Sequence, residues 1–98
     1  MEQDKLDGFI NTMKSDAPDD HHSPYLKALW YDANGNWQEA HNSIQDLLDK
    51  NAAWVHAYLH RKEGDLPNAD YWYSKAGKTR PPNTLNEEWE TLVKYFLQ

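Results

Sequence analysis

Apolar residues recur along most of the chain with the spacing of amphipathic helices. The clearest stripe places Trp37, Ala40, Ile44, Leu47 and Leu48 at positions i, i+3, i+7, i+10 and i+11, which is the pattern of one helical face. The chain contains no convincing alternation of apolar and polar residues, and only four of its residues are Val or Ile, so little of it favours a strand. The sequence therefore predicts an all-α fold.

Turn and capping residues divide this pattern into about six short helices. Ser23 followed by Pro24 is typical of a helix start, and Thr84 with Glu87 forms a capping-box pattern. We expect helices near residues 4–14, 24–34, 37–48, 52–63, 66–76 and 85–96, with a break near 50–51. They form one domain (1–98): an N-terminal helix in 1–15, a loop in 16–23, two helical hairpins in 24–82 and a C-terminal capping helix in 83–98.

The composition indicates a folded chain with an aromatic core. Leu, Ile, Val and Phe account for only 16 of the 98 residues, a level at which disorder becomes a real alternative. Five Trp and six Tyr argue for folding, because large rings bury much apolar surface and are rare in disordered chains.

Charge and cysteine content exclude several classes of function. The net charge of −6 argues against a nucleic-acid partner. The absence of Cys excludes disulfides, thiolate metal sites and a cysteine nucleophile. The longest apolar run, Ala52–Val55, is far shorter than a membrane span, and the acidic N-terminus is unlike a secretory signal. We therefore expect a cytoplasmic protein with no membrane or nucleic-acid partner.

The two expected hairpins share an internal sequence repeat. Each copy consists of a helix, a Gly turn and a second helix with a small residue at its inner face, and Ala40 is followed by Ala69 at an offset of 29 residues. The matched positions are Tyr31, Gly35, Trp37, Ala40 and Ile44 in the first copy and His60, Gly64, Leu66, Ala69 and Tyr73 in the second.

This pattern resembles the tetratricopeptide repeat, a family of stacked helical hairpins. Ala69, Tyr73, Ala76 and Pro81 match the signature of that family's second helix, although its usual period of about 34 residues is longer than the offset found here. The resemblance implies antiparallel hairpins in a right-handed superhelix, whose first helices line a groove for a protein or peptide. The groove positions carried over are Tyr25, Leu29, Asp32, Trp54, Tyr58 and Arg61.

A cluster of histidines offers an alternative function. His56 and His60 are four residues apart and Glu63 follows three residues later, so all three share one helical face. That arrangement is usable for Zn²⁺ or another transition metal, and His41 on the preceding helix is a further candidate ligand. Histidines at this spacing also occur on ordinary helices, so the pattern leaves both interpretations open.

The sequence favours partner binding over catalysis. It contains no nucleophile motif and no Gly-rich phosphate loop, so we expect a protein or peptide interaction module that is not an enzyme and carries no cofactor. Two alternatives remain: a small metal-binding helical protein or enzyme that uses His56, His60 and Glu63, and a homodimeric structural or regulatory protein whose partner is a second copy.

Overall fold

In the part of the chain that the structure describes, six short α-helices pack against one another. The computed structural model describes residues 2–98, with side chains from residue 4 onward. In this part of the chain no strand is present, and no helix is long and apolar enough to cross a bilayer. The elements are α1 (Glu2–Asn11), the 3-10 turn η1 (Thr12–Lys14), α2 (Pro24–Ala33), α3 (Trp37–Ile44), α4 (Lys50–Lys62), α5 (Leu66–Lys75) and α6 (Leu85–Phe96).

Capping side chains set several helix starts where the sequence predicts them. The Ser23 hydroxyl accepts a hydrogen bond from the Leu26 amide at 3.3 Å, with Pro24 in the first turn. Thr84 and Glu87 form a full capping box at the start of α6. These caps satisfy amide groups that have no partner within their own helix.

The two hairpins, α2–α3 and α4–α5, are built on equivalent turns. Gly35 and Gly64 follow the first helix of each hairpin and have φ values of 80° and 88°, a left-handed conformation that favours glycine. Ala40 and Ala69 occupy equivalent places in the second helices, and both are fully buried. The equivalence follows the 29-residue offset seen in the sequence.

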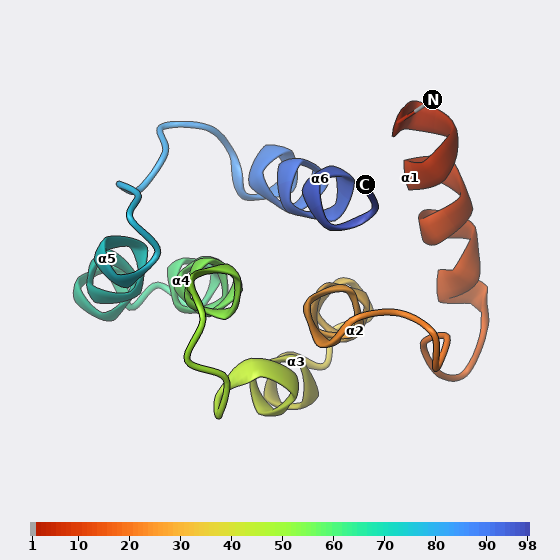
Figure 1. Cartoon of the computed structure of the whole chain (residues 1–98), viewed down its shortest axis with the longest axis horizontal. Helices are drawn as coiled ribbons and strands as arrows, with labels where there is room; N and C mark the ends of the chain where they lie inside the picture. Colours follow the sequence, from red (N-terminus) through yellow and green to blue (C-terminus); the bar gives the residue numbers. More distant parts are fainter. Residues whose placement is uncertain (1) are drawn as a thin grey trace.

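Helix α4 is the centre of the bundle. Residues 52–60 are all buried, and α4 packs against α2, α3, α5 and α6. Figure 1 shows α4 between α5 and α2, with α3 and α6 on its other two sides. Helix α6 also contacts α1 and α2, so it closes the bundle over the first helices of both hairpins.

The end of α3 differs from the prediction. The helix stops at Ile44, and Leu48, which the apolar stripe assigns to the same buried face, is 93% exposed. The reason is the strong cap that follows: Asp49 accepts a hydrogen bond from the Ala52 amide at 3.1 Å and starts α4. The chain must leave α3 to reach this cap, so Leu47 and Leu48 lie in the connection.

Candidate metal centre

Three histidines from two helices converge beside α4. His41 lies on α3, and His56 and His60 lie one turn apart on α4. One ring nitrogen from each lies within 4.8 Å of the other two, and the Nε2 atoms of His41 and His56 are 2.9 Å apart. The spacing of four residues aligns the α4 pair on one face, and the packing of α3 on α4 supplies the third ring.

Burial favours the neutral form of two of these imidazoles, His41 and His56. His56 and His60 are 5% and 7% exposed, whereas His41 is half-buried. Burial, together with the neighbouring imidazoles of His41 and His60, lowers the pKa of His56 to about 4. Burial is also the main cause of the lowered pKa of His41. A neutral imidazole retains the lone pair that binds a metal ion.

A carboxylate orients one of the rings. Glu63 Oε2 lies 2.9 Å from His60 Nδ1, and the Asn68 side chain lies 3.4 Å from His60 Nε2. A carboxylate on one ring nitrogen fixes the orientation of the imidazole and raises the basicity of the other nitrogen. A carboxylate on one ring nitrogen is common among histidines that bind metal.

Two tryptophans hold the remaining rings in place. Trp72 stacks on His56 with a centroid distance of 3.9 Å and an interplanar angle of 12°. Trp37 stacks on His41 at 4.9 Å and 13°. The Trp37 indole N–H also donates to the Leu59 carbonyl at 2.8 Å, which ties α3 to α4. The imidazoles are therefore held by aromatic packing before any ligand binds.

The spacing of the nitrogens suits a tetrahedral ion. Ligand distances of about 2.0–2.1 Å imply nitrogen separations of about 3.3 Å around Zn²⁺. The Nε2 atoms of His41 and His56 are 2.9 Å apart, close to that value, and none of the three nitrogens lies more than 4.8 Å from another.

The ligand set differs from the sequence hypothesis in one member. The sequence grouped Glu63 with His56 and His60, but the structure groups His41 with the two α4 histidines and places Glu63 with His60 and Asp65. Glu63 extends toward the exposed end of α4, where it pairs with His60 Nδ1. Glu63 therefore lies beside the cluster, and His41, which the sequence names as a further candidate, is its third histidine. The sequence alone does not place His41 in the cluster, because its position depends on how α3 packs on α4.

The face predicted to form an open groove is covered by α6. Leu29, Asp32 and Tyr58 are at most 2% exposed. The Tyr58 hydroxyl donates to Asp32 at 2.9 Å, and the indole of Trp89 on α6 donates to the Leu29 carbonyl at 3.0 Å. The physical reason is that α6 carries its own apolar stripe, and this face is the surface that buries it.

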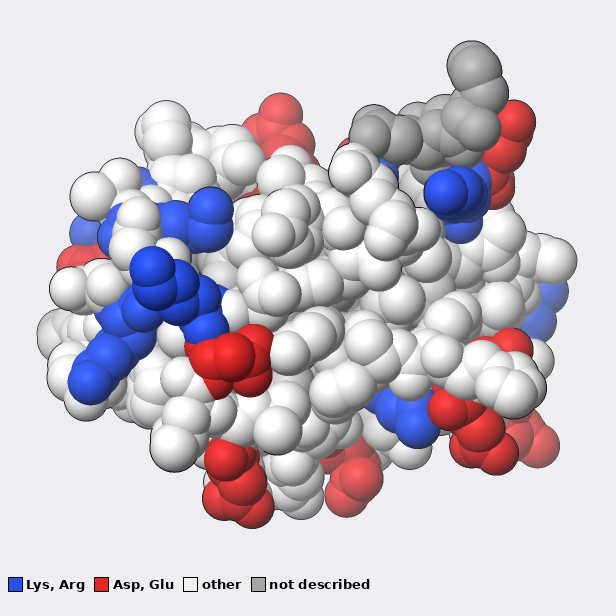
Figure 2. Space-filling view, in the orientation of Figure 1, with Lys and Arg blue, Asp and Glu red and all other residues white. Residues whose placement is uncertain are grey.

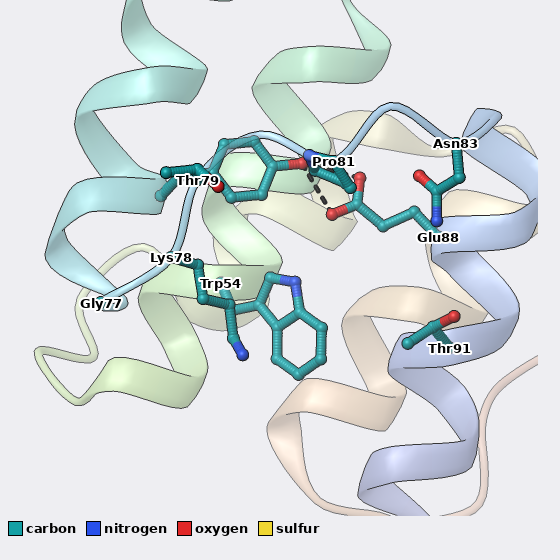
Figure 3. Close-up of a pocket in the computed structure, with 9 residues that line it drawn as sticks. Trp54, Gly77, Lys78, Thr79, Pro81, Asn83, Glu88 and Thr91 are labelled. Carbon is teal, nitrogen blue, oxygen red and sulfur yellow. Dashed lines mark hydrogen bonds between the residues drawn. The ribbon is translucent and has the colours of Figure 1, made fainter.

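Arg61, the fourth groove candidate, is also engaged within the chain. Its guanidinium pairs with Glu88 on α6 at 2.8 Å and bonds the side chain and carbonyl of Asn83. Glu88 is 2% exposed and accepts hydrogen bonds of 2.7 Å from the Tyr73 hydroxyl. Glu88 lies in a cleft that Trp54 and Thr91 also line, as Figure 3 shows.

Tyr25 and Trp54, the remaining groove candidates, contact the C-terminal end of α6. Tyr25 donates to Asp49 at 2.7 Å and stacks on Phe96 at 4.7 Å. Trp54 is 9% exposed and lies beneath the Lys78 ammonium, 4.2 Å from its ring centroid, as Figure 3 shows. Binding of a partner along the whole predicted face would therefore require α6 to move.

Comparison of the chain with protein-family models, with curated proteins and with solved structures finds no match in any of the three.

Proposed function

We propose that this protein binds a transition-metal ion through His41, His56 and His60. The observation that carries the proposal is the convergence of three ring nitrogens within 4.8 Å of one another on two packed helices. The Glu63 carboxylate on His60 and the stacked tryptophans support it, because metal-binding imidazoles need fixed orientations. Metal sites with three histidine ligands commonly share this arrangement, in which a carboxylate or another acceptor supports each ligating imidazole.

The donor set favours Zn²⁺, Cu²⁺ or Ni²⁺. Imidazole nitrogens suit these borderline ions, whereas Ca²⁺ and Mg²⁺ require oxygen ligands. Zinc accepts three histidines together with one further ligand. We therefore use Zn²⁺ as the reference ion for the proposal.

A bound ion would connect the two hairpins. His41 belongs to the first hairpin and the other two ligands to the second. Helix α3 has only eight residues, a length that is unstable in isolation, so coordination by His41 would stabilise its position on α4. In this proposal the two hairpins form a short array of the tetratricopeptide type, with α1 and α6 as its caps.

Calorimetric titration of the metal-free protein with Zn²⁺ tests the proposal. We expect one ion per chain, and a loss of affinity of at least about 100-fold in H41A and in H60A, because loss of a supporting group alone typically costs 10- to 100-fold. H21A is the matched control, since His21 is an exposed histidine in the 15–23 segment. Absence of zinc binding by the wild type, or equal affinity in H41A and H21A, would refute the site.

The role of Glu63 is tested by a conservative substitution. In E63Q the side chain keeps its shape and loses its charge, so His60 remains a ligand with a weaker supporting partner. We expect zinc affinity to fall by about 10- to 100-fold, less than in H60A. A loss as large as that in H60A would instead show that Glu63 is itself a ligand.

Partner binding is the second candidate function, supported by an exposed aromatic edge at the end of α6. Tyr95 is 50% exposed and lies 5.4 Å from Trp54 and 5.1 Å from Phe96 between ring centroids. Aromatic side chains are enriched at the cores of interfaces. One face of the molecule has a centre free of charged side chains (Figure 2), and depletion of charge is a further feature of interface cores. Capture of a binding partner by the wild type and its loss in Y95A would support this role, whereas equal capture by both would exclude this edge.

A further inference from the structure

We propose that a cleft between the end of α5 and the first turns of α6 binds a small carboxylate that carries an aromatic group. The cleft has a volume of about 510 Å³, within the range of about 300–1,000 Å³ that is typical of small-molecule sites. Its lining includes Trp54, Tyr73, Lys78, Thr79, Asn83 and Glu88 (Figure 3). None of the three clustered histidines lines this cleft, so the proposal is independent of the proposed metal binding.

Lys78 supplies a positive charge that no carboxylate neutralises. Among the described residues no carboxylate forms an ion pair with its ammonium, which lies instead 4.2 Å from the centroid of the Trp54 ring. The backbone at this position is fixed, because the Lys78 amide donates to the Tyr73 carbonyl at 2.8 Å in the turn that Gly77 makes after α5. The fold therefore holds an unpaired ammonium at the wall of the cleft.

Glu88, the other charged residue of the lining, is already neutralised. Its carboxylate is 2% exposed, pairs with Arg61 at 2.8 Å and accepts the Tyr73 hydroxyl at 2.7 Å. The guanidinium thus balances the carboxylate, and the ammonium of Lys78 is left as the excess charge of the three groups. In a cleft partly shielded from water this charge acts more strongly than in bulk solvent, so it favours an anionic ligand.

The surroundings of the cleft are also basic, although the chain has a net charge of −6. Lys75 and Arg80 flank Lys78 in the sequence, and Figure 2 shows basic side chains gathered on the side of the molecule where α5 ends. Arg80 makes only an exposed ion pair with Asp70, at 3.4 Å. A local excess of positive charge attracts anions to this part of the surface.

The remaining lining groups select a carboxylate with an aromatic body. The Asn83 side-chain oxygen accepts a hydrogen bond from Arg61 at 3.3 Å, and within the described residues its amide N–H groups have no acceptor. These N–H groups and the Lys78 ammonium are donors for a carboxylate. A ligand that draws the ammonium from the Trp54 ring exposes an indole face, on which an aromatic group of the ligand can stack.

Titration with benzoate, followed by two-dimensional ¹H–¹⁵N NMR, tests this proposal. We expect saturable shifts of the Trp54 indole N–H and of the amides of Thr79 and Asn83. Benzyl alcohol and benzylamine are the matched probes, because they carry a similar ring with no charge or with a positive charge, and both should bind more weakly. Absence of saturable shifts at these residues would overturn the proposal, as would binding of either matched probe as tight as that of benzoate.

Variants at Lys78 test the role of the ammonium. We expect benzoate affinity to fall by about 3- to 10-fold in K78Q, the effect of one nearby positive charge, and to be retained in K78R. K75Q is the matched control, because Lys75 is exposed near the same end of α5 but does not line the cleft. Equal benzoate affinity in K78Q and K75Q would overturn the proposal. Equal losses in K78Q and K78R would also overturn it, because they would show that packing rather than charge is responsible.

Discussion

The buried contact between Arg61 and Glu88 is expected to be a major determinant of stability. Glu88 is 2% exposed, and its carboxylate is held by Arg61 at 2.8 Å and by the Tyr73 hydroxyl at 2.7 Å. R61M keeps the length of the side chain and removes the guanidinium, which leaves Glu88 with one hydroxyl donor. Removing one partner of a buried ion pair typically costs about 3–5 kcal/mol, so we expect R61M to lose that amount.

The double variant separates the ion pair from simple loss of packing. In E88Q the amide still accepts the Tyr73 hydroxyl, and Arg61 keeps its bonds to Asn83, so we expect a smaller cost of about 1–2 kcal/mol. In R61M/E88Q no unpaired charge is left. The double variant should therefore be more stable than the sum of the single effects predicts, by about 1.5–3 kcal/mol.

Urea denaturation followed by circular dichroism at the helix band measures these free energies. R80M is the matched control, because Arg80 makes an exposed pair with Asp70 at 3.4 Å, and such pairs contribute about 0–1 kcal/mol. If R61M costs no more than R80M, or if the effects of R61M and E88Q simply add, the reasoning is wrong. The role of Arg61 would then have to be sought in binding rather than in the fold.

Two further predictions concern the tyrosines and the helix contacts. Hydrogen bonding to Asp49 raises the pKa of Tyr25 to about 12, and burial raises the pKa values of Tyr58 and Tyr73. In the unfolded chain the tyrosine hydroxyls ionise near pH 10. The free energy of unfolding should therefore be constant below pH 10 and fall above it, by up to about 1.4 kcal/mol per pH unit for each tyrosine. Tyrosinate absorbance in native and urea-unfolded protein checks this, and coincident titration curves would contradict it. A40W and A69W place a large ring at fully buried helix contacts and should each cost roughly 1–3 kcal/mol or more, whereas melting temperatures equal to that of the wild type would contradict the close helix packing.

Local signals explain which parts of the fold could be predicted from the sequence. The caps at Ser23 and Thr84 and the turns at Gly35 and Gly64 depend on residues within a few positions of each other, and all four occur where they were expected. The end of α3 was missed because an apolar stripe does not show where a helix stops. Asp49 decides that point, since its cap on α4 competes with continuation of α3.

The site was predictable only as far as its residues share one helix. His56 and His60 align through their spacing alone, whereas His41 joins them through the packing of α3 on α4. The groove hypothesis was wrong about the exposure of two charged residues for a related reason. The resemblance to the tetratricopeptide repeat places Asp32 and Arg61 in an open groove, but Lys62 pairs with Asp32 and Glu88 pairs with Arg61. Those partners depend on tertiary packing.

A last prediction distinguishes a functional histidine cluster from a structural one. A helix interface does not need imidazoles, because apolar residues of similar volume can fill the same space, and replacing both members of a buried polar pair by such residues is often neutral or stabilising. His41 and His56 form such a pair, with Nε2 atoms 2.9 Å apart. We therefore expect H41L/H56L to be as stable as the wild type, or up to about 2 kcal/mol more stable, when both are measured with a chelator present. Removal of functional groups from a site commonly stabilises a protein in this way. The same variant should lose zinc binding. If it unfolds more easily than the metal-free wild type by more than about 2 kcal/mol, the cluster serves the fold, and the histidines would no longer indicate a metal site.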